Sequence, residues 1–213
     1  MNYENNVLIV FLSCKKNQHL WDNLLKNIPN SIIFYGDPDL QEEYVLKNQI
    51  LQLRCEDTYD FLPKKIILMN RAICKIEQFQ DITHIFKIDD YDTVVPLNIQ
   101  YTLNSMELFD YCGQRLNGHI YPRWHFNKVS KDSFWYNKEY NKPENIEKIV
   151  WFDGGCGYIL SKKAMVYVAI ENEHTIGNNH IYEDTMVSMI LRKKNVYPKR
   201  IPIIIQGDKP VNC

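Results

Sequence analysis

The chain has 213 residues, with 25 basic and 26 acidic side chains and a net charge of −1 at pH 7. This length fits one globular domain, and the balanced charge argues against the broad basic surface of a general nucleic-acid binder. Hydrophobic residues make up 45% of the chain, which is enough for a buried core and gives no sign of disorder. We therefore predict one domain, residues 1–213, that binds no nucleic acid.

The beginning of the sequence carries no recognisable export or membrane signal. Residues 1–6 lack a basic region, and the apolar run Val7–Leu12 is too short for a signal-peptide core or a membrane span. The six cysteines form no C-x-x-C pair, a distribution typical of reduced thiols. We expect a soluble, cytoplasmic protein without a membrane span.

Apolar runs alternate with amphipathic stretches through the first 90 residues. Continuous apolar runs are typical of parallel strands covered on both faces, and apolar residues at helical spacing predict helices. The expected strands are residues 7–12, 32–35, 51–53 and 85–88, and the expected helices are residues 18–26 and 64–79. This order predicts βαβ units, hence an α/β fold with a mainly parallel central sheet and helices on both faces.

Three carboxylates follow the expected strand at residues 85–88: Asp89, Asp90 and Asp92. Asp90 and Asp92 lie two positions apart, so their side chains point to the same side of an extended backbone. Clustered carboxylates repel unless a cation lies between them, and oxygen ligands favour Mg²⁺ or Mn²⁺. The alternative is an acidic turn or helix cap without a metal.

Ser13 and Asp37 also fall at the ends of expected strands. In parallel sheets, ligands bind outside the carboxyl ends of the strands. This agreement favours the metal site, and with it a metal-dependent enzyme that acts on a phosphorylated or nucleotide-linked substrate.

The second half is less regular. Residues 111–147 are polar and aromatic, which is typical either of a flexible segment that closes over a substrate or of a surface loop whose aromatic side chains pack on the core. Three glycines in residues 154–157 permit a positive φ and a close approach to a ligand, or make a strained turn between strand and helix. Ser161 is expected to cap a helix over residues 162–170.

A further helical pattern opens with Glu183 and Asp184 and ends near Asn195. Acidic residues are common in the first turn of a helix, because the helix dipole stabilises negative charge there. Alternatively, one of these carboxylates is a general base, if its pKa suits the removal of a proton from a hydroxyl.

Four motifs in order resemble the inverting glycosyltransferases of the β-1,3-galactosyltransferase and Fringe family. They are an aspartate–tyrosine–leucine–lysine stretch, an acidic strand end, a glycine-rich segment and a Glu-Asp helix start, found here at Glu56–Lys65, Lys87–Asp92, Asp153–Ser161 and Glu183–Thr185. The resemblance spans about Val7 to Pro198. It implies a single-domain, Rossmann-like GT-A fold with a nucleotide-binding half, residues 1–92, and an acceptor-binding half, residues 93–213, that includes a flexible 111–147 segment.

The resemblance also implies the chemistry. A hexose would pass with inversion from a nucleotide-diphosphate sugar, with UDP the expected nucleotide, to a hydroxyl of a glycan or glycoprotein. Mn²⁺ (or Mg²⁺) would neutralise the leaving diphosphate, and Asp184 would be the base. The implied residues are Asp89, Asp90 and Asp92 for the metal, Ser13, Asp37, Arg71, Asp89 and Asp90 for the donor, and Asp153, Gly154 and Gly155 for the acceptor and sugar.

Two positions depart from the family pattern. Tyr91 interrupts the aspartate triplet, so the metal pair is either Asp90 with Asp92, which we favour, or Asp89 with Asp92. The family often places a metal-binding histidine after the Glu-Asp helix, yet no histidine follows His180 in the sequence. Asp208 or water would take its place.

Two other functions fit parts of the sequence. Asp90–Val94 matches the motif of haloacid-dehalogenase-type phosphatases, with Asp90 as nucleophile and Asp92 as general acid. That motif normally ends the first strand of its domain, and the glycine-rich segment would have no role. The second alternative is a catalytically silent module that binds sugar nucleotides.

Overall fold

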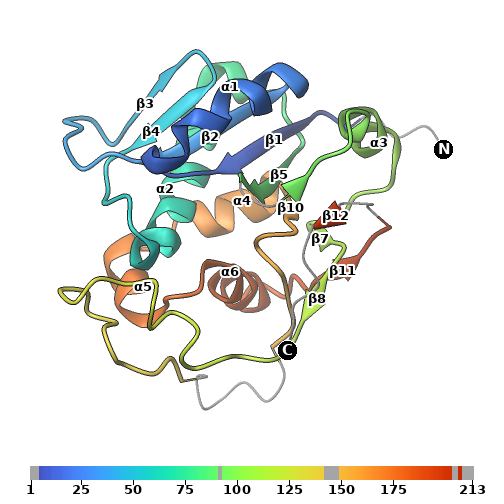
Figure 1. The fold of residues 1–213 in the computed structure, drawn as a ribbon. Coiled ribbons are helices and arrows are strands. Elements are labelled where there is room, and N and C mark those ends of the chain that lie inside the picture. The colour runs from blue at the N-terminus through green and yellow to red at the C-terminus, as the bar shows by residue number, and fades with distance from the viewer. Residues whose placement is uncertain (1–4, 91–92, 142–148, 203–205, 208–213) are drawn as a thin grey trace.

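The computed structural model describes residues 5–90, 93–141, 149–202 and 206–207, and it has an α/β fold (Figure 1). The strands are β1 (Val7–Leu12), β2 (Ser31–Gly36), β3 (Tyr44–Lys47), β4 (Ile50–Leu53), β5 (His84–Asp89), β6 (Thr93–Val94), β7 (Tyr111–Gly113), β8 (Leu116–Asn117), β9 (Trp151–Phe152), β10 (Tyr158–Ser161), β11 (Lys199–Arg200) and β12 (Gln206–Gly207). The α-helices are α1 (Gln18–Asn27), α2 (Leu62–Lys75), α3 (Ile99–Ser105), α4 (Lys162–Ala169), α5 (Glu173–Asn179) and α6 (Glu183–Arg192).

Eight of these strands form one sheet in the order β11-β7-β10-β5-β1-β2-β4-β3. Its centre is parallel: β1 pairs with β5 on one side and β2 on the other, and β4 extends the parallel part beyond β2. Antiparallel pairing enters at β10, which lies between β5 and β7, and at β3, which pairs with β4. The carboxyl ends of β1, β2 and β5 therefore meet at one edge, and the start of β10 lies at the same edge.

Helices cover both faces of the sheet, as the sequence predicts (Figure 1). Every residue of β1 is buried, as expected for a central strand between two layers. Its side chains alternate between faces: Val10 joins the cluster of buried residues that includes α2, α4 and α6, while Phe11 joins the one that includes α1 and α3.

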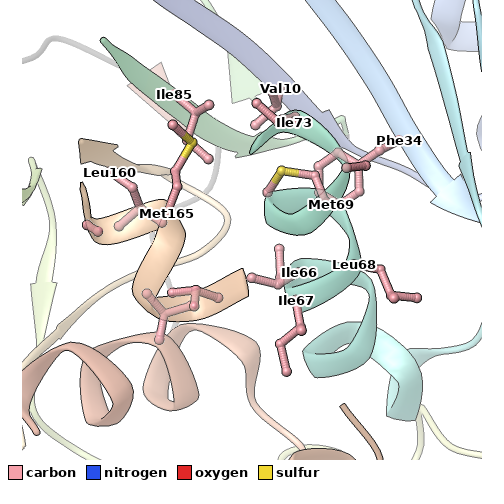
Figure 2. Packing of buried hydrophobic residues seen from close by; sticks show 14 of the residues in the cluster. Val10, Phe34, Ile66, Ile67, Leu68, Met69, Ile73, Ile85, Leu160 and Met165 are labelled. Carbon is pink, nitrogen blue, oxygen red and sulfur yellow. The ribbon is translucent and has the colours of Figure 1, made fainter. Parts of the chain in front are cut away.

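Figure 2 shows how α2 and α4 pack under the sheet. Met69 and Ile73 of α2 lie next to Val10, and Met165 of α4 lies under Ile85. All four α2 residues from Ile66 to Met69 are buried, so this helix is covered on more than one side by the sheet and by neighbouring helices.

The helix ends differ from the expected ones for local reasons. The helix expected over 64–79 ends at Lys75, because Ile76 is extended and a separate 3₁₀ turn covers Glu77–Phe79. Helix α6 stops at Arg192, and Asn195 beyond it has a φ of 59°, in the left-handed region that follows many helix ends. Ser161 caps α4 as predicted, because its hydroxyl accepts from the Ala164 N–H at 3.2 Å.

Residues 118–141 form turns and packed loops without helix or strand. Their buried aromatics Trp135 and Tyr140 cluster with Ile181 just before α6. The buried His125 ring lies 2.9 Å from the Tyr182 hydroxyl and 2.9 Å from the Lys138 carbonyl oxygen. In this conformation the segment packs its aromatics beside the start of α6, while residues 142–147 of the expected flexible segment lie outside the described residues.

Candidate active site

The ends of β1 and β5 bring Ser13 and Asp90 into direct contact. The Ser13 hydroxyl donates to Oδ2 of Asp90, Asn17 Nδ2 donates to Oδ1 at 3.1 Å, and the Trp21 indole N–H donates to Ser13 Oγ at 2.6 Å. Burial raises the pKa of the Asp90 carboxyl, although the Ser13 and Asn17 hydrogen bonds oppose the rise. Both oxygens of Asp90 thus accept from side chains that follow β1.

Asp37 lies at the end of β2, one strand further along the sheet. Its Oδ1 accepts from the Asp39 N–H at 3.1 Å, and Gln52 Nε2 lies 3.4 Å from Oδ2. The structure therefore places Asp37 at the same sheet edge as Ser13, with a separate set of hydrogen-bond partners.

Asp57 is an organising residue of this edge that the sequence analysis did not single out. Its carboxylate accepts from the Lys15 N–H at 2.7 Å, the Gly36 N–H at 3.1 Å and the buried Lys65 ammonium at 2.5 Å. It thereby joins the loop after β1, the end of β2 and helix α2. Its place in the Glu56–Lys65 motif was the available signal.

A buried lysine lies at the centre of the site. Lys87 is fully buried on β5, and its ammonium donates to Asp89 Oδ1 at 2.7 Å, Glu183 Oε1 at 2.5 Å and the Gly154 carbonyl at 3.1 Å. Burial lowers the pKa of Lys87, but the two carboxylates outweigh it and raise the pKa above its ordinary value. Lys87 therefore remains a cation that links the strand end, the glycine-rich segment and α6.

Glu183 and Asp184, the first two residues of α6, have different surroundings. Glu183 is buried, and its second oxygen accepts from the Tyr158 hydroxyl at 2.8 Å. Asp184 accepts from the Thr185 N–H at 2.7 Å through Oδ1, while its Oδ2 has, among the described residues, only a long contact of 3.4 Å from the Gly154 N–H. Asp184 is thus the carboxylate with an oxygen left for a substrate.

The pKa of Asp184 is raised to about 7, first by burial and then by the negative charge of Glu183. The Thr185 hydrogen bond and the Lys87 charge oppose this rise. A carboxylate with a pKa near neutrality can both accept and release a proton at physiological pH, which is the property of a general base.

The glycine-rich segment passes directly over this buried charge. A Cβ on Gly154 would lie 2.3 Å from Glu183 Oε1, and one on Gly155 would lie 3.8 Å from Asp89 Oδ2. Gly157 has a φ of 83°, which fits the sequence-based expectation of a positive φ here. Asp153 shapes the turn, because its Oδ1 accepts from the Gly155 N–H at 3.0 Å. The segment thus lies between the end of β5 and the start of α6.

Arg71 is not brought together with the other predicted donor residues. Its guanidinium on α2 pairs with Glu43 at 2.7 Å and Glu173 at 3.0 Å, and it also donates to the carbonyls of Ala169 and Glu171. In the structure it joins α2 to the β3 side of the sheet and to the connection between α4 and α5.

Arg71→Gln is expected to lower the free energy of unfolding by about 1–2 kcal/mol, because partly exposed ion pairs and two hydrogen bonds to carbonyls are lost together. Urea denaturation measures this loss. The KM for the donor, measured on the same variant, decides the nucleotide contact: a large increase in KM without loss of stability would contradict the architectural role.

The described carboxylates at the end of β5 already accept hydrogen bonds from protein groups. Asp89 Oδ1 accepts from Lys87, and both oxygens of Asp90 accept from Ser13 and Asn17. Within the described ranges, no group of three or more His, Cys, Asp or Glu side chains is placed to hold a metal ion. Asp92 and Asp208 lie outside those ranges, so the favoured pair of Asp90 with Asp92 stays a prediction.

The mainly parallel mixed sheet with helices on both faces, together with the family match, defines a glycosyltransferase of the GT-A class. The family model described as Galactosyltransferase matches residues 38–202, and the chain belongs to that family. This match confirms the family, the fold and the enzyme class that the four sequence motifs predict. A comparison with curated proteins finds no match.

The family implies a nucleotide-sugar donor and a glycan acceptor. Among the helices of the described residues, none combines the length and apolar character needed to cross a bilayer.

Proposed function

We propose that the protein transfers a hexose from a UDP-linked donor to a hydroxyl of a glycan or glycoprotein with inversion, and that Asp184 is the base. The observation that carries the proposal is the Asp184 carboxylate: it lies at the start of α6 beside the glycine-rich segment, and its pKa is raised to about 7. A base of this strength suits the proton of an acceptor hydroxyl in the transition state.

The proposed step is a single displacement. Asp184 takes the proton from the acceptor hydroxyl while the acceptor oxygen forms a bond to the anomeric carbon. The bond from that carbon to the diphosphate oxygen breaks, and the nucleoside diphosphate leaves with the electron pair. Attack from the face opposite the leaving group inverts the anomeric configuration.

Glu183, the neighbouring carboxylate, does not suit this role. Its two oxygens already accept from the Lys87 ammonium and the Tyr158 hydroxyl, and the side chain is buried. Using it as the base would break a buried ion pair.

The donor would lie along the edge where β1, β2 and β5 end. Ser13 and Asp37 would contact the nucleoside, and Gly154 and Gly155 would line the space for the sugar and the acceptor together with Asp153. Support comes from the direct contact between Ser13 and Asp90, and from the 3.8 Å between the Cβ position of Gly155 and Asp89 Oδ2.

A divalent cation, Mn²⁺ or Mg²⁺, would be held by Asp90 with Asp92, or by Asp89 with Asp92. When bound it would stabilise the negative charge of the leaving diphosphate. The described residues fit it in part, since Asp89 Oδ1 and both oxygens of Asp90 already accept protein hydrogen bonds.

The family match weighs against the phosphatase. The phosphatase motif would also have to start from Asp90, which follows β5 and not the first strand. The silent binding module differs from the transferase only in turnover. Asp184, with its raised pKa, favours the transferase.

The proposal is tested by incubating the protein and Mn²⁺ with a panel of UDP- and GDP-sugars, and by measuring nucleotide release with and without candidate acceptors. Removal of Mn²⁺ with a chelator should abolish nucleotide release. The proposal is contradicted if no donor releases its nucleotide and the protein shows no metal-dependent nucleotide binding. Hydrolysis of simple phosphomonoesters would favour the phosphatase.

We expect kcat/KM to rise with pH through a midpoint near 7, because Asp184 must lose its proton before it can act as a base. Below the midpoint, each pH unit should lower kcat/KM about tenfold. Rates measured from pH 5 to pH 9 at a fixed, saturating Mn²⁺ concentration check this. A flat profile between pH 5 and pH 7 would contradict Asp184 as the base.

A further inference from the structure

We propose that Lys87 is a positioning residue that holds the base-bearing start of α6 against the glycine-rich segment and the end of β5. It does so by donating to Glu183, Gly154 and Asp89 at the same time. The inference rests on the proposed function, in which Asp184 is the base, and it gives a reaction-specific role to a buried ion pair beside that base.

The geometry of Lys87 uses its full hydrogen-bonding capacity. An ammonium group has three donors, and the three acceptors come from three separate elements: Asp89 at the strand end, Gly154 in the glycine-rich segment and Glu183 on α6. Asp89 is two positions along β5, so its side chain lies on the same side of the strand. Moving any one of these elements breaks a bond to the same nitrogen atom.

Glu183 is fixed from its other side as well. Tyr158, which donates to its second oxygen, is the direct cross-strand partner of Lys87 in the β10–β5 pairing. The tyrosine and the lysine therefore approach Glu183 from adjacent strands. A carboxylate held at both oxygens fixes the rotation and height of the first turn of α6.

Gly154 connects this ion pair to the base through the two peptide groups that flank its Cα. Its carbonyl accepts from Lys87 at 3.1 Å, and its N–H lies 3.4 Å from Asp184 Oδ2. The carbonyl and the N–H belong to the two peptide groups on either side of the Gly154 Cα, so when Lys87 holds the carbonyl it holds Gly154 in place beside the base. Lys87 thus acts on Asp184 by two routes, through Gly154 and through Glu183.

The ionisable groups that act on Asp184 come from every element around it. Two are charged neighbours of opposite sign, Lys87 on β5 and Glu183 on α6, and a third is Asp153 in the glycine-rich segment. The others are tyrosines with pKa values raised chiefly by burial, which stay uncharged near neutral pH: Tyr59, Tyr111, Tyr140, Tyr158 and Tyr182. Changes to the two charged neighbours should therefore have opposite effects on the base.

The test compares the pH profiles of Lys87→Met and Glu183→Gln. Lys87→Met removes the positive neighbour of Asp184, so the midpoint of kcat/KM should move up by about one pH unit, whereas Glu183→Gln removes a negative neighbour and should move it down by a similar amount. In both variants kcat should fall about a hundredfold, since the base loses its position.

Breaking a buried ion pair can unfold a protein, so a double variant and a matched control complete the design. Lys87→Met/Glu183→Gln removes both charges and should fold better than Lys87→Met alone, with a midpoint close to wild type and a kcat that stays low. Lys65→Met breaks a second buried ion pair, Lys65–Asp57 at 2.5 Å, which organises the ends of β1 and β2 and is not bonded to Asp184; it should lower the melting temperature without moving the midpoint.

Midpoints that move in opposite directions in the two single variants, with low kcat in the folded double variant, support the positioning role. Unchanged midpoints, or a kcat that recovers in the double variant, overturn it and leave Lys87 a merely structural residue. An inactive wild-type protein would overturn the proposed function, and this inference with it. An active wild-type protein whose variants keep their midpoints would overturn this inference alone, so the two failures are distinguishable.

Discussion

Asp184→Asn is expected to lower the rate of sugar transfer about a thousandfold while donor binding stays close to that of the wild type. Asparagine has nearly the same shape as aspartate and can still accept from the Thr185 N–H, which lies 2.7 Å from Oδ1. It cannot take a proton from the acceptor hydroxyl. The loss should therefore fall on kcat rather than on the dissociation constant of the nucleotide.

The stability of this variant separates a lost base from a lost fold. Because the pKa of Asp184 is about 7 in the folded protein and its ordinary value is 3.8, the folded state binds more protons than the unfolded state between those values. Its contribution to stability therefore falls as the pH rises from about 4 to 7. Asp184→Asn removes this penalty, so at pH 7.5 we expect a melting temperature equal to or above that of the wild type.

Asp110→Asn is the matched control for this carboxylate-to-amide change. Asp110 accepts from the Ser161 hydroxyl at 2.6 Å. Ser161 ends β10 and pairs with His84 at the start of β5, so this contact lies at the opposite end of the strands from the candidate site. Transfer by this variant should stay within about twofold of wild type, as for a substitution remote from the site. If transfer persists in Asp184→Asn, the base is another group.

The sequence was sufficient to predict the elements that carry strong local patterns. β1 and β2 are almost continuous apolar runs, the interior of β5 is apolar apart from Lys87, and α1, α2 and α6 have apolar residues at helical spacing, so local composition decides their structure. β3, β7 and β11 were not predicted. They have two to four residues each, and β7 and β11 pair with strands distant in sequence, which a local pattern does not reveal.

The same division applies to the site. Carboxylates at strand ends and clustered glycines are visible in the sequence, so Asp89, Asp90, Gly154 and Asp184 were named there. The pairing of Glu183 with Lys87 was not predicted, because the two residues lie 96 positions apart and only the packing of α6 beneath the glycine-rich segment joins them. The one available signal was a lysine inside an otherwise apolar strand.

Helix periodicity also fails to identify the partners of a polar residue. Arg71 lies next to buried residues of α2. Because this helix precedes the acidic strand in the chain, a contact between Arg71 and the nucleotide was expected. The ion pairs to Glu43 and Glu173 depend on how the β3 hairpin and α5 pack around that helix. Neither element was predicted, so neither partner was.

Gly154→Ala is expected to lower the free energy of unfolding by about 3 kcal/mol. It should also lower the rate of sugar transfer by about a hundredfold or more. The added Cβ would lie 2.3 Å from Glu183 Oε1 and 3.2 Å from Lys87 Nζ. The Glu183 carboxylate is the end of a flexible side chain, but it is buried and held by both Lys87 and Tyr158. It cannot move aside without breaking a buried ion pair.

Two comparisons make this expectation specific. Gly118→Ala adds a Cβ whose nearest neighbour, the Ile149 carbonyl oxygen, is 3.7 Å away, an ordinary contact, so stability should change by about 0.5 kcal/mol or less. In a Glu183→Ala background the clashing oxygen is absent, so Gly154→Ala should cost much less there than in the wild type. Urea denaturation of the four proteins in this cycle measures the coupling between the two positions. Equal costs in both backgrounds would mean that Glu183 does not lie under Gly154, and the placement of the base-bearing helix against the glycine-rich segment would have to be revised.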